Sequence, residues 1–403
     1  MEIIVEKMEE LRQISKEIWK NPELGYEEKY AHKIITDFLK NNGFHVEESY
    51  LHPTGFRASF GTTSTNHRES GGGDKGSSHA CVMVEYDALP EIGHASGRNL
   101  VTETGLAAAI VIKSSIERGE TKGKVSVLGC PGHEGNGGKV DAIKKKFFED
   151  IDFAVSAQPY TSDISTPLML TIMRLCVTYK GKQAHASAHP WEGRNALDAA
   201  VLCYNNISVL RQQLKPLMQI HGIITKGGVK PNIIPGETEM EFYLRAKDHV
   251  DMAVLQQRAN GAFVAAAKAT GCEIEFNFQE KPYSNLTSNP TLAKLYEKNA
   301  EKYGISFTRN CEELQIPVGS TDVGNVSHVI PTILPTFSIG TSARNHTEAF
   351  AEAAGSDAAH ECALNVGKAL AATAIDVMSD KNLQMQIKED FTSVNSASMT
   401  AWH

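Results

Sequence analysis

The sequence predicts an α/β protein in which helices sandwich a mixed, mostly parallel sheet, with a small ferredoxin-like (βαββαβ) domain inserted into it. Three observations lead to this prediction. A chain of 403 residues is too long for one ordinary hydrophobic core. Through residues 1–165, strand-like apolar runs alternate with helical patterns, which favours a largely parallel sheet covered on both faces. After residue 166 the order becomes strand, helix, strand, strand, helix, strand.

The first part of the chain opens with an amphipathic helix, because apolar residues recur at helical spacing between Met8 and Ile18. A second helix over 27–42 ends at Gly43, a residue that terminates helices well. The other elements expected here are strands at 45–48, 56–60, 81–86 and 124–128 and helices at 106–118 and 140–148. The stretch Gly61–His79 is rich in Gly, Ser and Thr, which indicates a flexible surface loop.

The inserted domain is expected over residues 166–282, between two halves of the larger domain at 1–165 and 283–403. Its elements are, in order, a strand at 168–179, a helix at 195–213, strands at 219–225 and 237–247, a helix at 252–270 and a strand at 273–279. A long helix within 352–379 follows. An insertion between two halves of one domain leaves a cleft, and clefts are where small-molecule ligands usually bind.

Composition narrows the class of function. The formal net charge of -8 argues against a nucleic-acid partner, because phosphate binding needs clustered Lys and Arg. No apolar run approaches the roughly 20 residues that span a bilayer, and the N-terminus turns polar too early for a signal peptide. The seven cysteines are scattered and lack a Cys-x-x-Cys pair. We therefore expect no membrane association, reduced thiols and a cytoplasmic location.

Four segments carry polar residues typical of ligand sites: Glu85–Asn99, Pro131–Lys139, Gln183–Trp191 and Asn345–Glu348. The first holds Asp87 and His94, either as ligands at the carboxyl edge of a sheet or as parts of turns with local hydrogen bonds. The second places His133 beside Glu134 on a glycine-rich loop, as a base with its partner or as metal ligands. The spacing of a phosphate-binding loop is absent there.

The other two segments have simple structural interpretations. His185 and His189 are four residues apart, but Pro190 argues against the continuous helix on which both could ligate one metal. Near the last long helix, Thr347 or Asn345 could cap a helical turn.

Taken together, the segments resemble the aminoacylase and dipeptidase superfamily of two-metal amidohydrolases, which includes hippurate hydrolases, auxin-conjugate hydrolases and β-alanyl-lysine dipeptidase. The resemblance covers about Leu11 to Met378. Its most specific stretches are Tyr86–Pro90, Pro190–Gly193, Asn195–Ala200, Gly227–Pro235 and Gly319–Asp322. It implies a lid and dimerisation role for the inserted domain, a homodimer, and a small amine, amide or amino-acid-like substrate.

The resemblance also implies binding residues. His185 matches a family histidine that reaches a substrate oxygen across a dimer interface. Asn232 and Arg245 match positions that hold polar groups or the carboxylate of the substrate.

The pattern departs from the family at the metal site. The departures are Ser96 for a Cys, Arg98 for a His, His133 for the general-base Glu, and Gln158 for a His. Of the five expected metal ligands only Glu134 and His346 remain. Because a catalytic zinc site keeps at least three protein ligands and a guanidinium repels a dication, we expect no metal and no other cofactor, with zinc as the alternative.

These departures predict a metal-independent acid/base enzyme that performs a non-hydrolytic reaction, such as cyclisation or condensation, on a small metabolite. In this hypothesis His133 and Glu134 transfer protons, and Arg98 pairs with Glu134 as a fixed positive charge. The residues expected to contact the substrate are His185, Asn232, Arg245, His346, Ser96, Gln158, Asp87 and His94. The alternatives are an inactive pseudoenzyme that binds a small molecule or partner, and a residual metal-dependent amide hydrolase.

Overall fold

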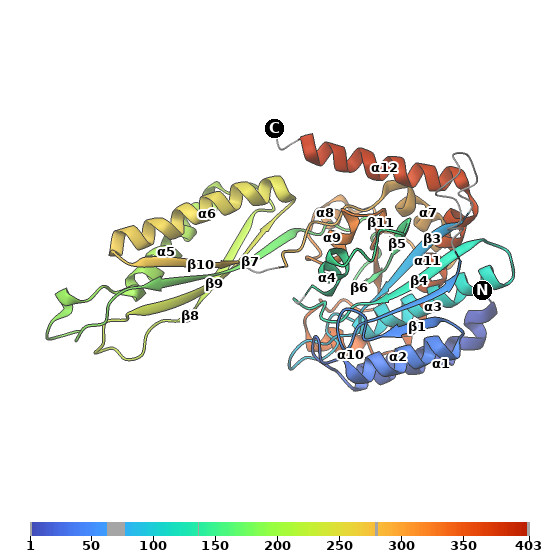
Figure 1. The fold of residues 1–403 in the computed structure, drawn as a ribbon, viewed down its shortest axis with the longest axis horizontal. Helices are drawn as coiled ribbons and strands as arrows, with labels where there is room; N and C mark the ends of the chain where they lie inside the picture. The colour runs from blue at the N-terminus through green and yellow to red at the C-terminus, as the bar shows by residue number, and fades with distance from the viewer. Residues whose placement is uncertain (1, 63–76, 136, 279–280, 401–403) are drawn as a thin grey trace.

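The computed structural model describes residues 2–62, 77–135, 137–278 and 281–400. Figure 1 shows a larger part, formed by the two ends of the chain, and an elongated part formed by the middle of the chain. The middle part begins with its first strand at Thr171 and ends with its last at Phe278, inside the predicted 166–282. The predicted domain boundaries themselves remain predictions.

A six-stranded sheet lies at the centre of the larger part, in the order β1-β2-β4-β3-β5-β11. Its strands are β1 His45–Glu48, β2 Phe56–Gly61, β3 Ser78–Val84, β4 Gly123–Gly129, β5 Phe153–Val155 and β11 Thr332–Ile333. The β3–β4, β3–β5 and β5–β11 pairs are parallel, whereas β1–β2 and β2–β4 are antiparallel. Every residue of β3 is buried, as expected for a strand covered on both faces. The prediction of a mixed, mostly parallel sheet is confirmed.

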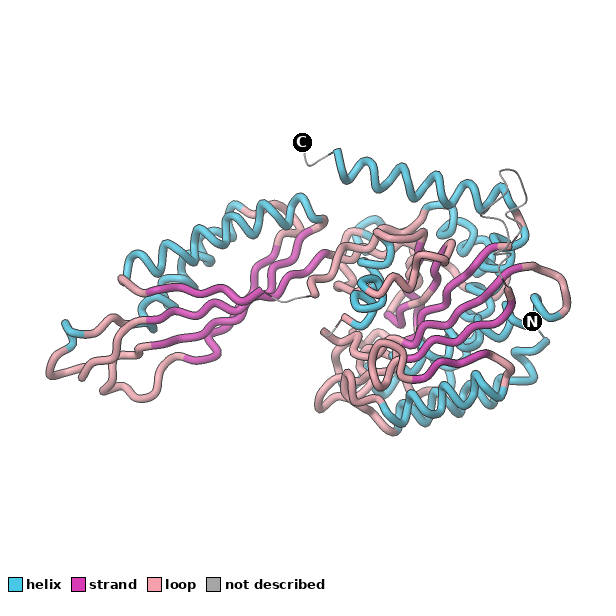
Figure 2. Tube along the Cα trace, viewed as in Figure 1, coloured by secondary structure: helices cyan, strands magenta, loops and turns pink. Residues whose placement is uncertain are grey.

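Helices surround this sheet (Figure 2). They are α1 Glu2–Lys20, α2 Lys29–Asn41, α3 Arg98–Glu117, α4 Gly138–Lys144, α7 Pro290–Glu301, α8 Cys311–Leu314, α9 Val323–Ser327, α10 Glu348–Ala353, α11 Asp357–Ser379 and α12 Lys381–Thr400. The short strands β6 Gln158–Tyr160 and β12 Thr336–Ser338 pair in parallel. No helix in the described part of the chain is long and apolar enough to cross a membrane.

Helix α3 begins at Arg98, well before the predicted Leu106. The helix is buried on nearly every side, including its polar residues Asn99, Thr102 and Glu103, so its first turns lack the separate polar and apolar faces that mark an amphipathic helix. Gly97 precedes the helix with a φ of 70°, a left-handed conformation that suits glycine. As a result Arg98 lies in the first turn of a buried helix rather than in a polar loop.

In the C-terminal region α11 lies within the predicted range 352–379, so the long helix expected there is confirmed. Ser356 caps its start by accepting a hydrogen bond from the Ala359 amide. Thr347 caps α10 in the same way, as one of the two predicted candidates. Helix α12 was not predicted. The predicted loop Gly61–His79 falls mainly on residues 63–76, which lie outside the described residues.

The middle part, which we call the lid, has the predicted order of elements: β7 Thr171–Lys180, α5 Ala196–Leu210, β8 Gln219–Lys226, β9 Glu237–Ala246, α6 His249–Thr270 and β10 Glu273–Phe278. Its antiparallel sheet has the order β10-β7-β9-β8. Alternate residues of β7 and β9, such as Leu175 and Phe242, are buried in a core shared with α5 and α6. The residues between them form the open face of the sheet. The prediction of a ferredoxin-like inserted domain is confirmed.

Candidate functional site

A cavity of about 530 Å³ lies between the larger part and the lid. Seven of the predicted site residues line it: Ser96, Arg98, His133, Glu134, Gln158, Arg245 and His346. They come from segments far apart in the sequence: the start of α3 and the loop before it, the glycine-rich loop after β4, strand β6, the loop before α10, and strand β9 of the lid. Among the lining residues that were not predicted are Arg174, Tyr243 and Tyr283.

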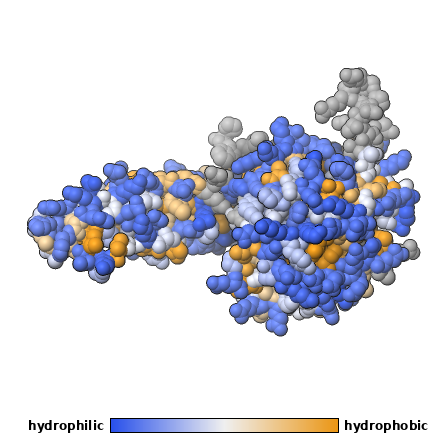
Figure 3. Space-filling view, turned by 60° about the horizontal axis from the view of Figure 1, so that its bottom comes forward, coloured by the Kyte–Doolittle hydropathy of each residue, from blue (hydrophilic) through white to orange (hydrophobic). Residues whose placement is uncertain are grey.

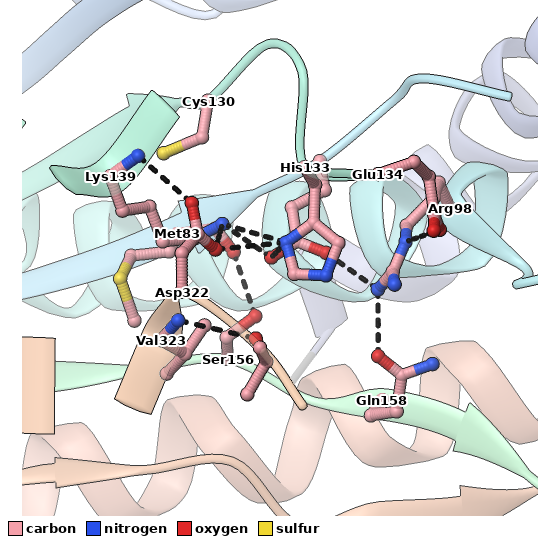
Figure 4. A network of polar contacts seen from close by, with 12 residues as sticks. Met83, Arg98, Cys130, His133, Glu134, Lys139, Ser156, Gln158, Asp322 and Val323 are labelled. Atoms are coloured by element: carbon pink, nitrogen blue, oxygen red, sulfur yellow. Dashed lines mark hydrogen bonds and ion pairs between the residues drawn. The ribbon is translucent and has the colours of Figure 1, made fainter. Parts of the chain in front are cut away.

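Arg98 lies at the floor of the cavity with its side chain only 6% exposed. Its Nη1 donates to Glu85 Oε2 at 2.6 Å and to Gln158 Oε1 at 2.7 Å. Its Nε donates to Glu134 Oε1 at 3.1 Å, so the predicted pair of Arg98 and Glu134 is present (Figure 4). Burial lowers the pKa of Arg98, but the carboxylates of Glu85 and Glu134 outweigh this effect and raise it. The guanidinium is a permanent charge, which its Nη1 and Nε hold against these three side chains.

His133 contacts two carboxylates through one ring nitrogen. Its Nδ1 lies 3.0 Å from Glu85 Oε1 and 3.0 Å from Asp322 Oδ1. Burial and the charges of Arg98 and Lys139 lower the pKa of His133, but these two carboxylates overcome them and raise it to about 9. His133 is therefore an imidazolium at neutral pH, which makes it a proton donor rather than a base.

Lys139 is completely buried beside His133 (Figure 4). Its Nζ lies 2.6 Å from Glu85 Oε1, 2.8 Å from Asp322 Oδ1 and 3.2 Å from His133 Nδ1. A buried ammonium is stable only when carboxylates neutralise it, and here two of them do so. This cluster joins the glycine-rich loop, the end of β3 and the start of α9.

Glu134 is the only carboxylate among the described residues that line the cavity. Burial raises its pKa, but Arg98 and His133 outweigh burial and lower it, so the side chain is ionised. Its backbone amide donates to Asp87 Oδ2 at 2.8 Å. Asp87 is buried beneath it, and burial, together with the charge of Glu134, raises the pKa of Asp87 to about 7.

The residues at the five family positions do not fit a metal ion. The Arg98 guanidinium occupies the space between Glu134 and Gln158, where it engages both side chains. A guanidinium cannot act as a ligand and repels a dication.

A different group has suitable donor types. Ligand atoms of Glu85, His133 and Asp322 all lie within 4.8 Å of one another. Metal–ligand bonds to such groups are about 2.0–2.2 Å long, and the Lys139 ammonium stands among the same three atoms. A divalent ion fits there only in place of the Lys139 side chain.

The remaining predicted residues lie outside the cavity wall. His94 is buried with its Nε2 3.0 Å from the Ile18 carbonyl oxygen of α1, and burial lowers its pKa to about 4. Asp87 lies beneath Glu134. His185 and Asn232 are exposed on neighbouring loops of the lid, joined by a hydrogen bond from the Ala186 amide to the Asn232 carbonyl. Whether these four residues contact a substrate remains a prediction.

Sequence reasoning missed the partners that control the charge of the site. These partners are Glu85, Lys139 and Asp322. Each lies in a segment that the sequence marked as site-like or family-like, but none was predicted as a site residue. The signal available for Asp322 was its place in the family-like stretch Gly319–Asp322. Nothing local indicated that Lys139 is buried, because its environment comes from three separate segments.

The chain is similar to known hydrolases over nearly its whole length. Residues 171–271 match the family described as "Peptidase dimerisation domain" (M20_dimer). The chain is 43% identical to "Xaa-Arg dipeptidase" of Homo sapiens, with 97% of this chain and 90% of that protein covered. It is 26% identical to one of the subunits of the p-aminobenzoyl-glutamate hydrolase of Escherichia coli, with 94% and 92% covered.

A dinuclear metal-binding peptidase from the M20 family of Bacillus subtilis shares the fold. Its structure matches with a TM-score of 0.67 at 19% identity, and the match covers 92% of this chain and 98% of that chain.

These findings correct the predicted function. The expectation of a metal-independent, non-hydrolytic enzyme is wrong, because it is at variance with the similarity to a dipeptidase over 97% of the chain. That prediction was based only on the positions where the metal ligands and the general base of the family are substituted. It overlooked the buried group Glu85, His133 and Asp322, whose donors become neighbours only through folding. The sequence is 43% identical to that dipeptidase over nearly its whole length. This chain therefore belongs to the M20 peptidase family.

Proposed function

We propose that this protein is a dipeptidase that hydrolyses small dipeptides with a basic C-terminal residue. The name of the human relative, "Xaa-Arg dipeptidase", supports this substrate class. The observation that carries the proposal is Arg245, whose Nη1 donates to Ser320 Oγ at 2.8 Å and whose Nε donates to His221 Nε2 at 3.3 Å. Both partners are neutral, and no carboxylate of the described residues forms an ion pair with Arg245. Its charge is available for the terminal carboxylate of a dipeptide.

The proton-transfer groups lie on the opposite wall of the same cavity. We assign Glu134, which is ionised, to accept the proton of the attacking water as its oxygen adds to the amide carbon. His133, which is protonated, donates a proton to the leaving nitrogen as the C–N bond breaks. Arg98 places a fixed positive charge beside the developing oxyanion.

The test is hydrolysis of alanyl-arginine, alanyl-lysine and alanyl-leucine by the purified protein, followed as release of free amino acids. Each assay is run as purified, with chelator, and with added zinc or manganese. We expect release of arginine and lysine and loss of activity in Glu134→Gln. Failure to cleave any basic dipeptide under all three conditions would refute the proposal.

We also propose that the protein forms a homodimer through the lid, as the match to the dimerisation domain suggests. Apolar side chains are exposed on α5 and on strand β8 of the lid, and Figure 3 shows apolar patches on its surface. They are Val201, Leu202, Tyr204 and Val209 of α5 and Ile223 and Ile224 of β8. Their burial between two copies would remove apolar surface from water. In such a dimer His185 would reach the partner's cavity, as the family resemblance implies.

A further inference from the structure

The open face of the lid carries a row of polar side chains that begins in the cavity. Arg245, Tyr243 and Glu241 alternate along β9 with Met240, Phe242 and Leu244, which are fully or almost fully buried. They therefore share one face at intervals of about 7 Å. Arg245 and Tyr243 line the cavity.

Glu241 is bound by an arginine of the same chain. Arg174 of β7 also lines the cavity, and its Nε and Nη2 lie 2.8 Å and 3.1 Å from the two oxygens of Glu241. The pair is bidentate, the geometry in which carboxylates bind guanidinium groups most specifically. The side chains are 44% and 23% exposed, so water can replace either partner at little cost in free energy.

The charges of the cavity wall single out Glu241 as an acceptor for a basic ligand. Among the described residues the wall carries three arginines, Arg98, Arg174 and Arg245, whereas its only carboxylate, Glu134, is held by Arg98. A dipeptide that ends in Lys or Arg brings one further cation, which needs a carboxylate to compensate for its lost hydration. Along the row that starts at Arg245, Glu241 is the first carboxylate. A basic side chain of the substrate can take the place of its partner, Arg174.

We propose that Glu241 binds the basic side chain of the substrate, at the place that the Arg174 guanidinium fills in this structure. The inference rests on the proposed dipeptidase function. With the substrate carboxylate on Arg245, the aliphatic stem lies over the Tyr243 ring and the charged head meets Glu241. Arg245 and Glu241 are four residues apart, about 13 Å along the strand, a span that their side chains and an extended Lys or Arg can bridge together. Arg174 then moves to solvent.

The experiment compares Glu241→Gln and Arg174→Met with wild type on alanyl-arginine and on the neutral alanyl-glutamine. Glu241→Gln should lower kcat/KM for alanyl-arginine by about 10- to 100-fold, the effect of losing a charged hydrogen-bond partner, and leave alanyl-glutamine within about 2-fold. Arg174→Met should act in the opposite sense and lower KM for alanyl-arginine, because it removes the internal competitor. Glu239→Gln is the matched control, since Glu239 is the next residue of the row and pairs with Lys226.

Binding of free arginine, measured by calorimetry, tests the same contact without turnover. Weaker binding in Glu241→Gln and tighter binding in Arg174→Met support the inference. Equal changes for basic and neutral substrates, or no change in arginine binding, overturn it. A wild-type protein that binds arginine through Glu241 but cleaves no dipeptide would refute the proposed function alone.

Discussion

The Nζ of Lys139 lies 2.8 Å from Oδ1 of Asp322, and neither side chain is exposed to solvent. The ammonium is also 2.6 Å from Glu85, so it balances two buried carboxylates at once. Removal of one member of such a cluster leaves a buried net charge that the remaining members do not balance. The pair therefore links the stability of the larger part to the charge of the glycine-rich loop that carries His133 and Glu134.

Replacement of Lys139 by Ala should lower the free energy of unfolding by about 3–5 kcal/mol, because the buried carboxylates of Glu85 and Asp322 then lose one of their counter-charges. Denaturant titration measures this change. The vacated space is surrounded by donors that suit a divalent ion, so zinc should raise the melting temperature of the variant more than that of wild type. An equal effect of zinc on both proteins would show that these donors do not bind it.

Replacement of Glu134 by Gln should lower kcat for a basic dipeptide by about 100- to 10,000-fold, because the amide cannot accept the proton of the attacking water. Arg98 keeps its contacts with Glu85 and Gln158, so the fold should persist, as circular dichroism can verify. Glu47→Gln, in an exposed pair with Arg57, is the matched control and should keep full activity. Retention of activity in Glu134→Gln would remove this residue from the mechanism.

Stability should fall as the pH rises towards 9. The pKa of His133 is about 9 in the folded protein and near 6.5 in the unfolded chain. Its contribution is therefore fully present below pH 6.5 and is lost as the pH rises through 9, at about 1.4 kcal/mol per pH unit. Urea titrations at a series of alkaline pH values measure the slope, and His133→Gln should flatten it. The same slope in the variant would mean that another group titrates.

Arg245→Met should raise KM for dipeptides with a free C-terminal carboxylate by about 10- to 100-fold. The reason is that the cavity loses an arginine that forms no ion pair with a carboxylate of the described residues and is therefore available to the substrate. The corresponding dipeptide amides lack this carboxylate and should be nearly insensitive to the substitution. Steady-state kinetics on the acid and amide pair separates the two cases. Equal losses on both would indicate that Arg245 supports the lid rather than the substrate.

Val209→Glu should weaken self-association, because it places a charge on a residue of α5 that is 75% exposed and apolar. Light scattering after size-exclusion chromatography measures the mass of the particle, which should change from dimer to monomer. Lys388→Glu, on the larger part, is the control and should leave the mass unchanged. A monomeric wild-type protein would refute the proposed homodimer.

The fold was predictable because its signals are local. Hydrophobic periodicity of two residues marks β7 and β9, and periodicity near 3.6 marks α1 and α2, whatever lies elsewhere in the chain. The signal failed where burial was complete, as at the first turns of α3. Seven of the eleven residues predicted for the site line the cavity.

By itself, then, the sequence determined the α/β architecture, the inserted lid and the segments that supply the site. Only the tertiary structure decided the charge states within it. His133 is next to Glu134 in sequence, yet its pKa depends on Glu85 and Asp322, which reach it from other elements. Electrostatic interactions depend on distance in space and on burial, and folding alone sets both of these.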